Sequence, residues 1–115
     1  KAQSEGEVVA GTRALLVDDL TTDGQSKRNF CLALRGAGLQ VRHLLSIFYY
    51  DTFAESRRTM EELDIQIHAL ATWQDIIGLA KADNFLTPGD IDKVELFLSH
   101  TSDWSKAHGG IGRLN

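Results

Sequence analysis

The sequence predicts an α/β fold in which helices cover both faces of a parallel sheet. A short apolar run, Ala14 to Val17, is bounded by polar residues and is typical of a strand buried on both faces. A helical pattern follows it, and a second apolar run, Leu39 to Tyr50, comes next. A strand, a helix and a second strand predict a right-handed parallel crossover, so the carboxyl ends of both strands meet at one edge.

The stretch between the first strand and the helix carries the polar groups expected of a ligand site. Asp18 and Asp19 follow the apolar run, at the edge where ligands bind in open α/β sheets. Gly24 permits a tight turn and a close approach to a ligand. The positive end of the following helix suits a phosphate, whereas the carboxylates suit hydroxyl groups or a metal ion. These preferences describe a sugar phosphate, although a plain loop with a serine helix cap fits the same residues.

The segment from Val17 to Ser26 resembles the phosphoribosyl pyrophosphate (PRPP) motif of type I phosphoribosyltransferases. In that family two acids end an apolar strand and a Thr/Gly-rich loop begins a helix, as here. The resemblance implies that the acids hold the ribose hydroxyls and the loop holds the 5-phosphate. Asp23 and Gln25 depart from the family pattern, and we expect the Asp23 side chain to point away from a phosphate. The implied PRPP-binding residues are Asp18, Asp19, Leu20, Thr21, Thr22, Asp23, Gly24, Gln25 and Ser26.

Further segments resemble the orotate phosphoribosyltransferases, in particular a bacterial branch of them. These are the run from residues 3–6 through the PRPP motif, and residues 48–53, 68–73 and 103–110. The resemblance implies that phosphoribose passes from PRPP to orotate with Mg2+, giving orotidine 5′-monophosphate and pyrophosphate in de novo pyrimidine (UMP) biosynthesis. Thr22 is an implied base contact, and Tyr50 and Asp51 are further candidates, although Tyr50 could instead belong to the core. The family typically has an Asp-Arg pair here, but no arginine precedes Arg57, so the partner of the orotate carboxylate stays open.

The rest of the chain predicts four more helices and a third strand. The first helix should present Phe30, Ala33, Leu34 and Ala37 to the core, because they fall at i, i+3, i+4 and i+7. A helix at 53–63 and an alternating strand at 65–70 follow. A capping box begins a helix at Thr72, and a proline at the first helical position begins another after Thr87. A short helix at 102–108 ends the series. Cys31 reads as a core residue, and His68 as a structural residue near a sheet edge.

Three strands are too few for a free-standing doubly wound domain, and the first strand would keep an uncovered edge. We therefore expect residues 1–115 to form the C-terminal part of a single phosphoribosyltransferase domain, with the PRPP motif at 14–26 and C-terminal helices at 72–108. The resemblance implies that a mobile catalytic loop lies upstream of Lys1, which is either its last basic residue or an ordinary exposed lysine. It also implies a homodimer.

Composition excludes several other classes of protein. The net charge of −4 argues against a general nucleic-acid binder, and no apolar run is long enough to span a membrane. The single cysteine cannot form an internal disulfide, and a reducing cytoplasm is the expected location. No histidine pair has metal-ligand spacing, so we expect no structural metal. Two alternatives remain open: a phosphoribosyltransferase for another base, and a regulator that senses PRPP with the same fold.

Overall fold

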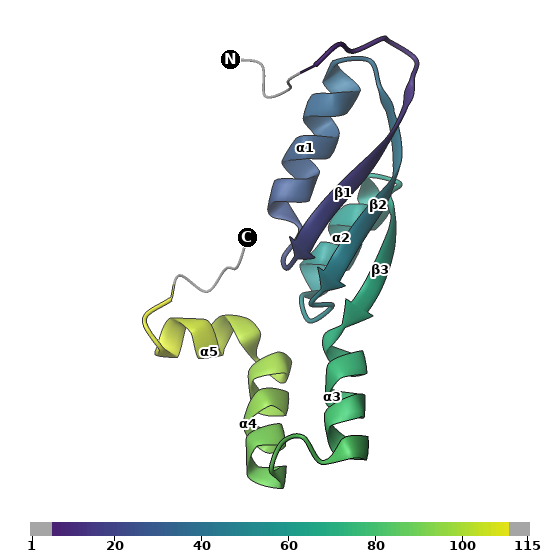
Figure 1. Ribbon diagram of the computed structural model, residues 1–115. Coiled ribbons are helices and arrows are strands. Elements are labelled where there is room, and N and C mark those ends of the chain that lie inside the picture. Colours follow the sequence, from purple (N-terminus) through teal and green to yellow (C-terminus); the bar gives the residue numbers. More distant parts are fainter. Residues whose placement is uncertain (1–5, 111–115) are drawn as a thin grey trace.

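A computed structural model describes residues 6–110 and shows a parallel sheet followed by an arm of three helices (Figure 1). Lys1 and residues 3–5 therefore lie outside the described residues. Residues 7–9 belong to no strand or helix. The elements in chain order are β1 (Arg13–Thr21), α1 (Gln25–Gly36), β2 (Gln40–Tyr49), α2 (Ala54–Glu62), β3 (Gln66–Thr72), α3 (Trp73–Asp83), α4 (Pro88–Ser99) and α5 (Thr101–Ala107).

The described strands pair in the order β1-β2-β3, and both pairings are parallel. Asp18 on β1 lies opposite Ser46 on β2, and Thr21 lies opposite Tyr49. Beyond the ladder, the Tyr50 N–H donates to the Thr21 carbonyl at 3.0 Å. The carboxyl ends of the first two strands therefore meet, as the predicted crossover required.

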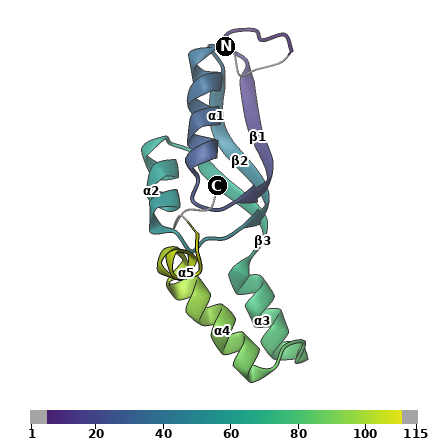
Figure 2. The same ribbon diagram turned by 90° about the vertical axis from the view of Figure 1, so that its left-hand side faces the viewer.

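Helices cover only one face of the sheet within the described residues. Both ribbon views place α1 and α2 on the same side (Figures 1 and 2). The exposed fractions on the other face are 55% for Leu15, 63% for Val17, 54% for Ile47 and 71% for Leu70. The prediction of a first strand buried on both faces is therefore wrong for this part of the protein. When right-handed crossovers add strands in one direction, successive helices fall on the same side, and a reversal of order is needed to cover the other.

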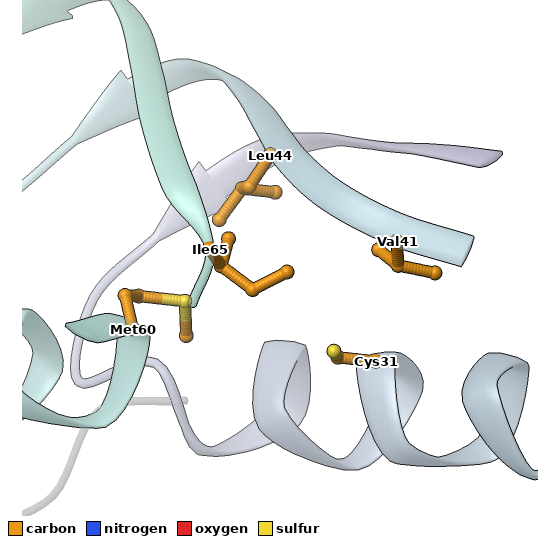
Figure 3. Packing of buried hydrophobic residues seen from close by; sticks show 5 residues of the cluster. All are labelled: Cys31, Val41, Leu44, Met60 and Ile65. Atoms are coloured by element: carbon orange, nitrogen blue, oxygen red, sulfur yellow. The ribbon is translucent and has the colours of Figure 1, made fainter. Parts of the chain in front are cut away.

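The core lies between the sheet and these two helices. Cys31 from α1, Val41 and Leu44 from β2, Met60 from α2 and Ile65 before β3 converge there (Figure 3). Their exposed fractions range from 0 to 6%.

The apolar face predicted for α1 is wrong by about one residue around the helix. Phe30 is 49% exposed, whereas Cys31 is fully buried and Lys27 is 6% exposed. Ala33 and Ala37 are exposed as well. The buried stripe therefore runs through Lys27 and Cys31 toward Leu34. Because a lysine occupies its first position, the stripe does not show up as a run of apolar residues at helical spacing.

Side-chain hydrogen bonds join α1 to the sheet. Others cap the N-termini of α3 and α4 in the arm. The Arg35 guanidinium, in the last turn of α1, donates to the carbonyls of Val41 at 2.7 Å and Leu63 at 2.6 Å. The capping box at Thr72 is confirmed, because its hydroxyl and the Asp75 carboxylate each accept the other's backbone N–H. Pro88 follows an N-cap at Thr87, also as predicted.

The arm makes the described chain elongated, with extents of 52 × 31 × 24 Å. It leaves the carboxyl end of β3 and turns back through α4 and α5 (Figure 1). No helix among the described residues is long and apolar enough to cross a membrane.

Candidate functional site

The end of β1 positions the two acids of the motif. The strand continues to Thr21, so Asp18 and Asp19 belong to it and do not follow it. Each carboxylate accepts the next backbone N–H at 2.8 Å: Asp18 Oδ1 from Asp19 and Asp19 Oδ1 from Leu20. The Asp18 side chain is 31% exposed, and Asp19 is exposed to solvent.

Lys27 completes this acidic corner from the first turn of α1. Its ammonium forms an ion pair with Asp18 Oδ2 and donates to Ser26 Oγ at 3.0 Å. Burial raises the pKa of Asp18, but hydrogen bonds from Lys27 and Asp19 outweigh that effect, so the pKa of Asp18 lies below its usual value. The corner therefore holds a carboxylate that stays ionised beside a buried cation.

Gly24 makes the turn from the strand into the helix. It is the N-cap of α1, with φ of 84°, and no side chain caps this helix. A Cβ atom at this position would lie 3.4 Å from Ser56 Cβ and Met60 Cε on α2. The predicted need for glycine is confirmed for the turn, and the close approach observed is to α2. The serine cap that the sequence allowed is absent.

The Asp23 side chain differs from its prediction. It is only 8% exposed, and its Oδ1 accepts the Gln25 N–H at 3.0 Å. The carboxylate therefore turns back onto an amide of the loop and does not point away. It takes the kind of donor that a bound phosphate would use, because free N–H groups at a helix start bind anions.

The residues of the loop differ in their exposure to solvent. Leu20 and Gln25 are exposed, and Ser26 is half-buried. Thr21 is fully buried, and its hydroxyl has no hydrogen-bond partner within the described residues. Thr22 is 2% exposed. Asp19, Leu20 and Gln25 are thus the exposed members of the predicted PRPP-binding set, and Asp18 and Ser26 are half-buried.

The candidate base contacts lie at the end of β2, next to the loop. Tyr50 packs edge-on against Phe48 and Trp73, with ring centroids 5.9 and 5.7 Å apart. Asp51, with φ of 54°, forms a two-point ion pair with Arg57, whose Nε lies 2.6 Å from Oδ1. The hydrogen bonds that Arg57 donates to the Asp51 carboxylate raise the pKa of Arg57. Asp51 therefore pairs with an arginine six residues further along the chain, in the first half of α2.

A cavity of about 700 Å³ opens beyond these residues, between α3 and α4. Asp51 and Thr52 line it from the sheet edge, and Trp73, Lys81 and Ser99 line it from the arm. The Trp73 indole N–H is buried and has no hydrogen-bond partner within the described part of the chain. This cavity adjoins the predicted base contacts but does not include the acids or the loop.

Sequence reasoning missed two charged residues of this region. Lys27 was not among the predicted site residues, yet it is buried against Asp18. Arg57 looked too distant from Asp51, yet the two lie side by side because the chain turns sharply into α2. A lysine four residues before a buried cysteine was the available signal for Lys27, since positions i and i+4 share a helix face.

The chain is similar to known proteins. No family model matches the chain. The protein named orotate phosphoribosyltransferase from Sinorhizobium fredii (strain NBRC 101917 / NGR234) is 38% identical over 113 residues, which are 98% of this chain and 49% of the relative. The protein of the same name from Ruegeria sp. (strain TM1040) is 41% identical over 107 residues, 93% of this chain and 47% of the relative.

A solved structure matches as well. The structure of Leishmania donovani UMP synthase has a TM-score of 0.69 and 26% identity to this chain, covering 82% of this chain and 21% of that one. The chain spans about half the length of the curated relatives it matches.

Proposed function

Since this chain is a relative of the orotate phosphoribosyltransferases, we propose that the complete protein transfers the 5-phosphoribosyl group from PRPP to orotate. The products are orotidine 5′-monophosphate and pyrophosphate, in pyrimidine biosynthesis. The single observation that carries the proposal is the corner where β1 ends and α1 begins. An exposed carboxylate, Asp19, lies there within a few residues of a helix N-terminus at Gly24.

The two ends of a sugar phosphate fit the two parts of this corner. The first N–H groups of α1 suit the 5-phosphate, because they are free of helical partners and lie at the positive end of the helix dipole. A carboxylate accepts hydrogen bonds from the ribose hydroxyls, which suits Asp19 and, beside it, Asp18. For the phosphate to bind the Gln25 N–H, the Asp23 carboxylate must release that amide.

The same residues favour the reaction by position and charge. As pyrophosphate leaves C1 of the ribose, positive charge develops on the ring, and carboxylates fixed near the sugar stabilise that charge. The loop holds the far end of the sugar, so C1 meets the base at a set distance. We place the base against Thr22, Tyr50 and Asp51, since Tyr50 bonds to the end of β1 through its backbone.

The residues present fit a Mg2+ ion that arrives with the substrate. Mg2+ is commonly held by one or two carboxylates together with substrate phosphates, and an exposed Asp19 offers such a carboxylate. The described residues contain no cluster of three or more metal-binding side chains. When bound, the ion neutralises charge on the pyrophosphate.

We also propose that the rest of the protein covers the open face of the sheet. Leu15, Val17, Ile47 and Leu70 form a contiguous apolar surface on β1, β2 and β3, and such surfaces are rarely left exposed. The relatives are about twice as long as this chain, so they have enough additional residues to cover it. A homodimer and a cytoplasmic location complete the proposal.

Replacing Asp19 tests the site in the full-length protein. Asp19→Asn removes a charge from an exposed side chain, so the fold should survive, while PRPP affinity should fall about 10- to 100-fold, the equivalent of roughly 1.5–3 kcal/mol. Asp92→Asn, on the exposed surface of α4, is the matched control and should bind normally. Isothermal titration with PRPP measures both. Equal affinity in the two variants would remove Asp19 from the site.

A further inference from the structure

Lys27 is a charged residue at a core position of α1. It is 6% exposed and lies on the same helix face as Cys31, which is fully buried. A buried ammonium needs a partner, since an unpaired buried charge is strongly unfavourable. The ammonium of Lys27 therefore depends on its partners in the chain, and replacing Lys27 with a neutral residue removes a buried positive charge.

Its partners belong to the two parts of the proposed PRPP site. Asp18 lies near the carboxyl end of β1, and Ser26 lies in the first turn of α1. The Lys27 ammonium contacts both, so it joins the acidic end of the strand to the start of the helix behind the loop. Neither contact depends on a bound ligand.

The Lys27–Asp18 ion pair gives Asp18 a different environment from its neighbour Asp19. Both oxygens of Asp18 are engaged within the chain, one by the Asp19 N–H and the other by Lys27. The charged groups that face Asp18 are Lys27 from α1 and Asp19 from its own strand, while β2 places the uncharged Ser46 opposite. Lys27 is thus the cation that offsets the charge of Asp18 where an anionic ligand would bind.

We propose that Lys27 is a positioning residue of the PRPP site, which acts through Asp18 by fixing its carboxylate and compensating its charge. This inference rests on the proposed function and deepens it. Without the lysine, an uncompensated Asp18 carboxylate repels the phosphates of the ligand and loses its fixed orientation. The lysine itself does not need to contact the ligand.

A double-mutant cycle in the full-length protein tests whether Lys27 acts through Asp18. The probe is ribose 5-phosphate, measured by isothermal titration at pH 7, so no base or catalysis is involved. Lys27→Met should weaken binding by about tenfold or more, because a charge-assisted hydrogen bond is lost and a carboxylate is left uncompensated. In an Asp18→Asn background the same substitution should weaken binding by less than about threefold, since no charge is left to compensate.

Two further variants and a pH series separate this role from a merely structural one. Lys27→Arg keeps the charge and should bind within about threefold of wild type, and Arg28→Met, on the exposed side of the same helix, is the matched control. Loss of Lys27 removes an influence that lowers the pKa of Asp18, so Asp18 in Lys27→Met should protonate at a higher pH. The binding defect relative to wild type should therefore shrink as the pH falls, and the shrinkage should begin at a higher pH than the protonation of Asp18 in the wild type.

The outcomes distinguish this inference from the proposed function. Wild-type protein that binds no ribose 5-phosphate would overturn the proposed function and this inference with it. Wild-type binding with an unchanged Lys27→Met variant would overturn the inference alone. Equal losses in the wild-type and Asp18→Asn backgrounds would also overturn it, since Lys27 would then act independently of Asp18. If Lys27→Met does not fold, a tenfold loss in the folded Lys27→Arg variant contradicts the charge role.

Discussion

Arg35 offers a direct test of how the first helix is fixed to the sheet. The guanidinium donates to the carbonyls of Val41 and Leu63 at 2.7 and 2.6 Å, which joins α1 to β2 and to the end of α2. Val41 lies beside an irregularity in the pairing of β1 with β2, between Ala14 and Leu15. Arg35→Met keeps most of the side-chain volume but removes both donors.

The expected loss follows from these two bonds. A hydrogen bond from a charged group contributes about 1.5–3 kcal/mol, and a half-buried carbonyl left without a donor adds a desolvation penalty. Allowing for partial rescue by water, Arg35→Met should lower the free energy of unfolding by about 2–4 kcal/mol. In a protein as long as the curated relatives, which are about twice the length of this chain, that would correspond to a fall in Tm on the order of 10 °C.

Thermal unfolding followed by circular dichroism is the assay, with Arg28→Met as the control on the same helix. Arg28 is exposed, so its substitution should leave Tm nearly unchanged. Arg35→Lys should recover only part of the loss, because one ammonium cannot match the two-pronged geometry. Equal Tm values for Arg35→Met and Arg28→Met would refute the reasoning.

Two further predictions concern the corner of the motif. Gly24→Ala forces an L residue to φ of 84° against Ser56 and Met60, so stability should fall by about 1–2 kcal/mol, whereas Gly89→Ala on α4, with open space around it, should be neutral or stabilising in the same urea titration. Because the pKa of Asp18 lies below its usual value of 3.8, its contribution to stability is complete above that pH and is lost as the pH falls through the folded value. The difference in Tm between wild type and Asp18→Asn should therefore be constant from pH 5 to 7 and shrink toward pH 3; a constant difference down to pH 3 would contradict the role of Asp18.

Much of the fold could be predicted from the sequence because local signals agreed with the tertiary structure. The second apolar run, the capping box at Thr72 and the proline after Thr87 each marked a boundary within two residues of the observed one, whereas β1 continues four residues beyond the end of the first apolar run. The buried face of α1 could not be predicted, because Lys27 occupies the first position of its stripe and finds its partner on another strand. A search for apolar periodicity has no means of recognising a buried ion pair.

The site was predictable in its residues but not in its contacts. The motif from Asp18 to Ser26 does form one strand end, one loop and one helix start. The orientation of Asp23 depended on a bond to the Gln25 amide, and the Asp51–Arg57 pair depended on the backbone turning at a positive φ before α2. Both are consequences of backbone geometry that residue types alone do not determine.

The open face of the sheet has a similar explanation. The apolar character of Val17 and Ile47 predicted burial, but within the described residues both helices lie on the other side. Apolar sequence reports that a side chain is buried in the complete protein, and it does not report which segment covers it. The strand itself was predicted correctly, whereas the expected covering of its second face by helices is not found within the described residues.

The central claim is tested most directly by following orotate in the ultraviolet with the full-length protein, PRPP and Mg2+. The account predicts that orotate is consumed and pyrophosphate released only when PRPP is present, and that Asp19→Asn slows the reaction strongly while Asp92→Asn does not. Consumption of hypoxanthine, guanine or adenine in place of orotate would contradict the proposed substrate. Binding of PRPP with no base consumed would contradict the proposed reaction and favour a regulator that senses PRPP.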